Sequence, residues 1–136
     1  MILAIDDDPT RYEALRAILA ERPGSPLLVV ASCPACVGSY VLHARAVLLD
    51  YDLDRNRDPD TDEEQASACT CGTVAAPGHN GGVFVPLLQG RRVIVTSANP
   101  GGAALLARQL GAPRIRILDM DATERVVCQL WRWGVL

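Results

Sequence analysis

The chain has 136 residues, a formal net charge of −3 at pH 7, 49% hydrophobic residues and 21% charged residues. This size and composition are those of one globular domain with its own core, so we treat residues 1–136 as a single domain. No apolar stretch reaches the roughly 20 residues of a membrane span, no signal-peptide pattern opens the chain, and a net negative charge argues against a general nucleic-acid-binding surface. We therefore expect a cytoplasmic protein without membrane contact.

Apolar runs alternate with helical patterns in the first 50 residues. Ile2–Ile5 is continuously apolar, which is typical of a strand buried on both faces. Asp8-Pro9 has the pattern of a helix N-cap followed by proline at N1, and the apolar spacing predicts a helix over about residues 9–21. The other elements expected in this part are a strand at Leu27–Ala31, a short helix from Pro34 to about Leu42 and a strand at Arg45–Leu49.

Residues 51–80 interrupt the alternation. They contain charged residues, glycine, proline and cysteine without clear periodicity, and they are far longer than a usual connection between a strand and a helix. Eight of the sixteen acidic residues lie between Asp50 and Glu64, so negative charge is concentrated there. We treat residues 53–80 as an insertion in the domain.

The alternation resumes after the insertion. The expected elements are a helix at Gly82–Gln89, a strand at Arg92–Val95, a helix at Ala104–Leu110 with Asn99-Pro100 as its start signal and Gly111 as its stop signal, a strand at Ile115–Leu118 and a helix at Ala122–Trp133. Five alternating β and α units with right-handed crossovers predict an α/β fold. It is a flavodoxin-like, doubly wound, five-stranded parallel sheet of order 2-1-3-4-5.

Carboxylates follow two strands that this order makes neighbours. Asp6 and Asp7 follow the first strand, and Asp50 and Asp52 follow the third. Because adjacent strands lie about 4.8 Å apart, the carboxylates would repel each other unless a hard divalent cation lies between them. We therefore predict Asp6, Asp7 and Asp50 as ligands of Mg²⁺ or Mn²⁺, with Asp52 assisting and Asp50 as a candidate nucleophile. The alternative is that some of these acids only cap helices, an interpretation that we prefer for Asp8.

A polar segment follows the strand at Arg92–Val95. It contains Thr96, Ser97 and Asn99 and leads into the glycines at positions 101 and 102. Free backbone N–H groups at the N-terminus of a helix are suited to bind a phosphate, and glycine permits close approach. We predict a phosphate site here, although the same residues are also satisfied by a plain asparagine N-cap followed by proline.

Four of the five cysteines form two closely spaced pairs. Cys33 and Cys36 belong to a Cys-Pro-Ala-Cys motif, and Cys69 and Cys71 come from the insertion. Together they could form a closed tetrahedral site for structural Zn²⁺. A redox-active dithiol and unrelated buried cysteines are the alternatives. We expect Cys128 in the core. Two histidines could replace a cysteine ligand, His43 and His79.

The opening segment resembles that of a two-component receiver domain. It runs from Met1 to Ile18 and reads Met-Ile-Leu-Ala-Ile-Asp-Asp-Asp-Pro-Thr-Arg-Tyr-Glu-Ala-Leu-Arg-Ala-Ile. The resemblance implies that Asp6 and Asp7 bind magnesium and that Asp50 accepts a phosphoryl group. Receivers also place a lysine after the fifth strand, and the matching stretch 117–120 contains no basic residue.

Two further motifs resemble the signatures of the cyclic-phosphate-processing receiver-like family. Residues 49–53, Leu-Asp-Tyr-Asp-Leu, are similar to Leu-Asp-His-Asp-Leu, and residues 97–102, Ser-Ala-Asn-Pro-Gly-Gly, are similar to part of His-Ser-x-Asn-Pro-x-Gly. Tyr51 and Thr96 stand where these signatures have histidine. The resemblance covers nearly the whole chain outside residues 53–80. It implies a receiver fold that acts on cyclic phosphate or other phosphoester ends.

The leading hypothesis is a divalent-metal-dependent phosphoesterase or phosphate-binding domain. Its partner would be a phosphate-bearing small molecule, a nucleotide or an RNA end. One alternative is a receiver or pseudo-receiver signalling module phosphorylated on Asp50, and another is a zinc-stabilised interaction domain. The sequence does not indicate the oligomeric state. The candidate catalytic residues are Asp50, Asp52, Thr96, Ser97 and Asn99.

Overall fold

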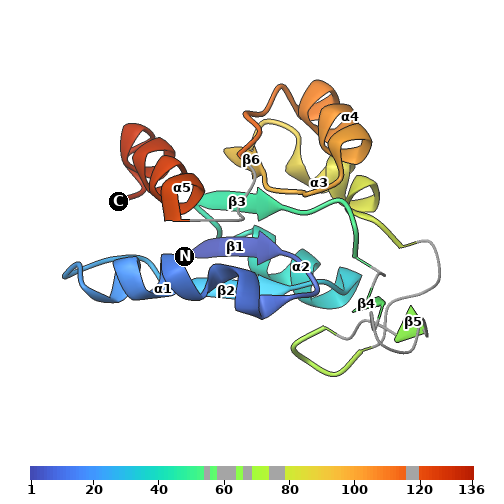
Figure 1. The fold of residues 1–136 in the computed structure, drawn as a ribbon, viewed down its shortest axis with the longest axis horizontal. Helices are drawn as coiled ribbons and strands as arrows, with labels where there is room; N and C mark the ends of the chain where they lie inside the picture. The colour runs from blue at the N-terminus through green and yellow to red at the C-terminus, as the bar shows by residue number, and fades with distance from the viewer. Residues whose placement is uncertain (54–55, 58–63, 66–68, 74–78, 116–119) are drawn as a thin grey trace.

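The computed structural model describes residues 1–53, 56–57, 64–65, 69–73, 79–115 and 120–136. The described residues form an α/β fold in which a parallel sheet lies between two layers of helices (Figure 1). The strands of this sheet are β1 (Ile2–Ile5), β2 (Leu28–Ala31), β3 (Ala46–Leu49) and β6 (Val93–Val95). Their order is β2-β1-β3-β6, so the predicted order of the first four strands of the sheet is confirmed.

The sheet of the described residues has four strands, whereas the sequence predicted five. Most of the predicted strand Ile115–Leu118 lies outside the described residues, which stop at Ile115 and resume at Met120. Beside β6, Arg114 forms a single parallel bridge with Val95, and the Ile115 N–H donates a hydrogen bond of 2.9 Å to the Val95 carbonyl. The chain therefore reaches the sheet edge where the fifth strand was expected.

A small antiparallel sheet lies within the insertion and was not predicted. It pairs β4 (Asn56–Arg57) with β5 (Glu64–Gln65) and is separate from the main sheet. Each strand is only two residues long, too short to show the alternating hydrophobicity by which strands are recognised.

The helices agree with the expected elements, although several boundaries differ. The predicted helix over residues 9–21 is divided into a 3₁₀ turn and an α-helix, and the same holds for the predicted helix Gly82–Gln89. Asp8 caps the first 3₁₀ turn by accepting a hydrogen bond of 3.0 Å from the Thr10 N–H. The helical elements are η1 (Pro9–Tyr12), α1 (Glu13–Ala20), α2 (Pro34–Val41), η2 (Gly81–Phe84), α3 (Val85–Leu88), α4 (Pro100–Leu110) and α5 (Met120–Arg132).

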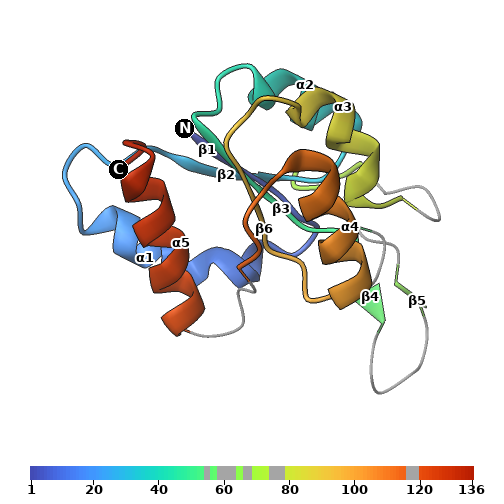
Figure 2. The same ribbon diagram turned by 90° about the horizontal axis from the view of Figure 1, so that it is seen from above.

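The two faces of the sheet belong to two hydrophobic clusters, because successive side chains of a strand point to opposite sides. On one face, α1 and α5 pack over a cluster that includes Ile2, Ala4 and Leu48. On the other face, α2, α3 and α4 pack over a cluster that includes Leu3 and Leu49. Figure 2 shows α1 and α5 on one side of the strands and the other three helices on the opposite side.

One cysteine lies elsewhere than expected. Cys128 is exposed on α5, so its predicted place in the core is wrong. The buried residues of this helix include Val126, Val127 and Leu130, and Cys128 is not among them. No helix in the described part of the chain has the length and hydropathy of a transmembrane span.

Candidate functional site

Two aspartates and a threonine lie side by side where the strands of the sheet end. The hydrogen-bond ladder continues one residue past each strand: the Asp50 N–H donates to the Ile5 carbonyl and the Thr96 N–H donates to the Leu49 carbonyl, both at 2.9 Å. Since Ile5 pairs with Leu49 in the parallel register, Asp6 and Asp50 follow directly at the same level of the sheet. Register alone thus brings together acids that are 44 positions apart in the sequence (50 − 6).

Asp6, Asp7 and Asp50 form one acidic group. Each residue offers a carboxylate oxygen, and these oxygens all lie within 4.8 Å of one another. Asp6 and Asp50 are buried, with 2% and 0% of their surface exposed. The juxtaposition predicted from the sequence is therefore present, and the group could hold a metal ion.

Arg11, from the 3₁₀ turn η1, lies against this group. Its Nη1 atom is 3.2 Å from Asp6 Oδ2 and 3.1 Å from Asp50 Oδ2. The hydroxyl of the buried Tyr12 donates a second hydrogen bond, of 2.8 Å, to Asp6 Oδ2. Sequence reasoning missed Arg11. Its place in the first turn after the Asp6-Asp7 pair was an available signal, because that turn begins at the sheet edge where the acids lie.

Burial makes the charged form of both inner carboxylates unfavourable. Burial and the neighbouring charge of Asp50 raise the pKa of Asp6 to about 7, although Arg11 acts in the opposite direction. Burial also raises the pKa of Asp50, again against the effect of Arg11. Both oxygens of Asp50 are buried, Oδ2 is paired with Arg11, and the Ser97 side chain and the Tyr51 backbone also act to lower this pKa. A single arginine thus faces two buried carboxylates, so their negative charges exceed the positive charge next to them when both are ionised.

The segment after β6 forms the next wall of the site. The Asn99 side chain caps α4 by accepting a hydrogen bond of 2.9 Å from the Gly102 N–H. Ser97 Oγ accepts a hydrogen bond of 3.2 Å from the Asn99 N–H, and Thr96 Oγ1 lies 3.4 Å from the Tyr12 hydroxyl. The asparagine cap that the sequence indicated is therefore present.

Asp52 lies apart from the acidic group. Its Oδ1 atom is 3.5 Å from Asn99 Nδ2, and its backbone forms an antiparallel bridge with Asn80. The carboxylate therefore faces the start of α4, and it is not among the three acids whose oxygens lie within 4.8 Å of one another.

Tyr51 packs on the first turn of α4. A Cβ atom added at Gly102 would overlap the Tyr51 ring, so glycine at this position is what admits the ring. A Cβ atom added at Gly81 would likewise overlap the Asp50 carbonyl oxygen, and the Gly81 N–H donates a hydrogen bond of 2.8 Å to the Tyr51 carbonyl. Tyr51, which stands where the signature Leu-Asp-His-Asp-Leu has histidine, thus packs against α4.

A pocket adjoins this wall. It has a volume of about 350 Å³, and its lining includes Ser97, Pro100, Arg114 and Arg125. Ser97 thus lines a pocket together with two arginines. Neither arginine was singled out from the sequence, because nothing local marks an exposed arginine as part of a pocket.

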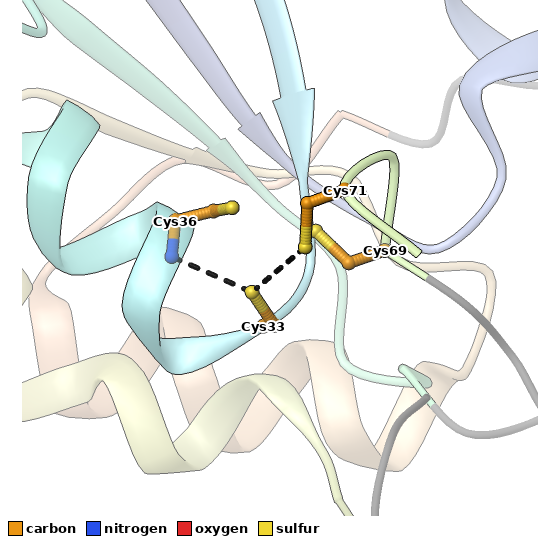
Figure 3. Close-up of side chains that lie close together, drawn as sticks. All are labelled: Cys33, Cys36, Cys69 and Cys71. Atoms are coloured by element: carbon orange, nitrogen blue, oxygen red, sulfur yellow. Dashed lines mark hydrogen bonds between the residues drawn. The ribbon is translucent and has the colours of Figure 1, made fainter. Parts of the chain in front are cut away.

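The four cysteines of the two predicted pairs meet in space (Figure 3). All four Sγ atoms lie within 4.8 Å of one another, and all four residues are free thiols. Cys33 and Cys36 come from the start of α2, while Cys69 and Cys71 come from a turn of the insertion. This group could hold a metal ion, and among the described residues it includes neither His43 nor His79.

The thiols of this cluster have unequal acidities. Burial raises the pKa of Cys69, but hydrogen bonds from backbone N–H groups, including that of Ser32, outweigh this effect and lower it to about 5. The neighbouring Cys33 thiol, followed by Cys71, raises the pKa of Cys36 to about 12.

His79 lies on the same side as the cysteines. Its Nε2 atom is 3.1 Å from the Ser32 carbonyl oxygen, and its ring packs edge-on against Phe84 with 5.6 Å between the ring centroids. The side chain is half-buried.

Comparisons of the chain with protein-family models, curated proteins and solved structures gave no match.

Proposed function

We propose that this chain is a receiver-like domain that binds Mg²⁺ or Mn²⁺ through Asp6, Asp7 and Asp50 and acts on a phosphate ester. The observation that carries the proposal is the acidic group itself: the carboxylates of Asp6, Asp7 and Asp50 lie together, Asp50 has no exposed surface, and a single arginine faces the two buried acids. Burying like charges together is costly unless a cation compensates them. In this proposal the chain around Ile115 continues into a fifth strand, giving the order 2-1-3-4-5.

The donor atoms of the acidic group favour a hard ion. Magnesium and manganese prefer carboxylate oxygens, and magnesium retains waters that substrate oxygens can replace. Thiol sulfurs are poorly suited to these ions and suit zinc instead. Since Asp50 has no exposed surface, an entering cation needs Arg11 to move away or to share the carboxylates.

The phosphate is proposed to lie between the acidic group and the start of α4. Ser97 can donate its hydroxyl hydrogen to a phosphate oxygen, and the N-terminus of α4 favours negative charge. Arg114 and Arg125, in the pocket next to Ser97, supply positive charge for a second phosphate or for the rest of a nucleotide. The net charge of −3 is consistent with a small nucleotide or a single RNA end as substrate.

Two routes of hydrolysis fit these residues. In one, water attacks the phosphorus, the ester P–O bond breaks and the leaving oxygen takes up a proton. In the other, an Asp50 oxygen attacks the phosphorus, the ester P–O bond breaks and its oxygen takes up a proton. Water then cleaves the acyl phosphate, which frees the Asp50 carboxylate and releases the phosphorylated product. A bound divalent cation supplies charge neutralisation at the phosphate oxygens in both routes.

The test is hydrolysis of 2′,3′-cyclic nucleotides and of RNA oligonucleotides with cyclic or terminal phosphates, with Mg²⁺ or Mn²⁺. We expect turnover by the wild type and its loss in Asp50→Asn, with Mn²⁺ binding measured by calorimetry on both proteins. Glu13→Gln is the matched control, because Glu13 is an exposed acid on α1. Absence of Mn²⁺ binding, or equal activity of wild type and Asp50→Asn, would contradict the proposal.

A second candidate function is phosphoryl acceptance on Asp50 as a signal. The observation that favours it is the ion pair between Arg11 and Asp50, because a cation next to the acceptor is what the absent lysine would otherwise provide. Incubation with acetyl phosphate and Mg²⁺ separates the two functions. A stable phosphorylated form in intact-mass spectra supports signalling, and rapid release of inorganic phosphate supports hydrolysis.

A further inference from the structure

We infer that Cys33, Cys36, Cys69 and Cys71 form a closed structural zinc site that fastens the insertion to the end of β2. This site is separate from the proposed phosphate chemistry, because none of its ligands belongs to the acidic group. It would define this chain as a domain whose insertion depends on a metal, whatever reaction the aspartates perform.

The sulfur positions suit a tetrahedral ion. Zinc–sulfur bonds of about 2.3 Å place the ligand sulfurs of a tetrahedron roughly 3.8 Å apart. The Sγ atoms of Cys33 and Cys71 are 3.6 Å apart, and all four sulfurs lie within 4.8 Å of one another. A disulfide would need a separation of about 2.05 Å. Four thiolates complete the coordination of zinc without leaving an open position, which is the mark of a structural site.

The backbone on the β2 side is arranged to receive charged sulfurs. Cys33 is the N-cap of α2, and its Sγ accepts a hydrogen bond of 3.4 Å from the Cys36 N–H (Figure 3). The Ser32 N–H donates a hydrogen bond of 3.3 Å to Cys69 Sγ. N–H groups directed at sulfur stabilise the thiolate form and orient metal ligands. The hydrogen bond from Ser32 connects the segment that carries Cys33 and Cys36 to Cys69 of the other pair.

The insertion side is a tight turn. Within residues 69–73, the Gly72 N–H donates to the Cys69 carbonyl at 2.7 Å and the Cys69 N–H donates to the Thr73 carbonyl at 2.8 Å. Gly72 has φ +90°, a conformation that favours glycine, and it follows Cys71 directly. The turn places both sulfurs on the side that faces α2.

This turn buries little apolar surface of its own. Cys69 is buried, but residues 70–73 are exposed. Besides the sulfur contacts, a hydrogen bond of 2.9 Å from Thr70 Oγ1 to the Val30 carbonyl attaches the turn to β2. Because the contacts of this turn within the described part of the chain are few, a cross-link would contribute much of its stability, and a metal ion provides one.

Ser32 connects the cysteine cluster to the end of the insertion. Its N–H donates to Cys69, and its carbonyl lies 3.1 Å from His79 Nε2. Residues 79–81 then run along the strand end that carries the acids, with Asn80 bridged to Asp52 and Gly81 against the Asp50 carbonyl. Zinc binding is therefore expected to order the His79 region as well as the cysteine turn.

The experiment measures zinc in the full chain purified under reducing conditions. We expect one zinc ion per chain by elemental analysis, and thiolate-to-cobalt charge-transfer bands with tetrahedral d–d bands after Co²⁺ substitution. Cys69→Ser should lose the zinc and these bands. Cys128→Ser is the matched control and should keep both, because Cys128 is exposed on α5, away from the cluster.

A second measurement covers the case in which Cys69→Ser fails to fold. Removal of zinc from the wild type with a chelator should lower its melting temperature and speed amide exchange in residues 69–73 and 79–84, and added zinc should reverse both effects. Asp50→Asn should retain its zinc, so failure of the phosphate proposal leaves this result unaffected. A reduced wild type that binds neither zinc nor cobalt, a disulfide in the freshly purified chain, or full zinc content in a folded Cys69→Ser variant would overturn the inference.

Discussion

The guanidinium of Arg11 lies 3.1 Å from Oδ2 of Asp50, a carboxylate that has no exposed surface. The same Nη1 atom lies 3.2 Å from Asp6, so one positive charge is shared by two buried acids. The arginine side chain itself is 29% exposed, which gives it a path toward solvent. Arg11 is therefore the counter-charge of these acids, and the divalent cation that we propose would compete with it for the same carboxylates.

Replacing Arg11 by glutamine should separate its effect on stability from its effect on Mn²⁺ binding. Without the guanidinium the two carboxylates lose their counter-charge, so we expect the metal-free variant to be less stable by about 1–3 kcal/mol, given the partial exposure of the pair. The increase in melting temperature on adding Mn²⁺ should be larger than in the wild type, because the ion no longer competes with the arginine. Thermal denaturation with a chelator and with Mn²⁺ measures both.

The matched control for this prediction is Arg16→Gln. Arg16 is exposed on α1, and no ion pair involving it is seen among the described residues. Its replacement should change neither the stability of the metal-free chain nor the response to Mn²⁺ appreciably. Equal increases in melting temperature with Mn²⁺ in Arg11→Gln and the wild type would mean that the arginine and the ion do not compete for the same carboxylates.

The raised pKa of Asp6 predicts an unusual pH dependence of stability. Burial, followed by the charge of Asp50, raises this pKa from 3.8 to about 7. The folded chain thus keeps a proton that the unfolded chain has lost. The resulting stabilisation is complete below about pH 4 and is lost as the pH rises toward 7, by up to about 4 kcal/mol.

Urea unfolding of wild type and Asp6→Asn from pH 4 to pH 8, in buffer without Mg²⁺ or Mn²⁺, isolates this contribution. The asparagine cannot ionise, so the free energy of unfolding of the variant should decline less over this interval. Added Mn²⁺ should restore wild-type stability mainly at the upper end, where Asp6 is ionised and able to bind. Parallel curves for the two proteins would show that Asp6 titrates normally.

Two neighbouring glycines provide a paired test of the Tyr51 packing. A Cβ at Gly102 overlaps the Tyr51 ring, whereas a Cβ at Gly101 would meet only Asn99 Oδ1, at 3.7 Å. Gly102→Ala should therefore destabilise the chain by about 1–3 kcal/mol, while Gly101→Ala should be neutral or slightly stabilising. Chemical denaturation gives both values.

Combining Gly102→Ala with Tyr51→Ala completes a double-mutant cycle. If the ring is what resists the added methyl group, the cost of Gly102→Ala should largely vanish when the ring is absent. An undiminished cost in the Tyr51→Ala background would locate the strain elsewhere in α4.

The sheet and the acidic group were predictable because strands buried on both faces have a strong sequence pattern. Ile2–Ile5 was predicted with its observed boundaries, and β3 starts one residue after the predicted strand Arg45–Leu49. Once the strand order followed from the alternation, the aspartates after these strands had to lie at one sheet edge. Their proximity was a consequence of register and needed no information on side-chain packing.

The contacts made by long or exposed side chains were not predictable in this way. Arg11 reaches the aspartates through a side-chain conformation, and Arg114 joins Ser97 at a pocket through packing that no local pattern encodes. The orientation of Asp52 toward Asn99 likewise depends on how the chain leaves β3. Cys128 was misplaced because a small hydrophobic residue in an apolar helix can lie on either face.

Asn99 allows helix capping to be separated from phosphate binding. Its Oδ1 accepts the Gly102 N–H at 2.9 Å, and its Nδ2 lies 3.5 Å from Asp52 Oδ1. Asn99→Ala removes the cap and should cost about 1 kcal/mol of stability. Asn99→Asp keeps a good capping oxygen, so its stability should stay closer to that of the wild type, reduced by repulsion from Asp52.

Phosphate binding should respond in the opposite order. Aspartate at position 99 adds negative charge where the proposal places a phosphate, so Asn99→Asp should weaken binding of a nucleotide more than Asn99→Ala does. Calorimetric titration with a 2′,3′-cyclic nucleotide in the presence of Mn²⁺ measures this, and unfolding experiments on the same samples measure the cap. If Asn99→Ala, the less stable variant, also bound the nucleotide more weakly than Asn99→Asp, the residue would serve only as a cap. The phosphate would then have to lie away from the start of α4.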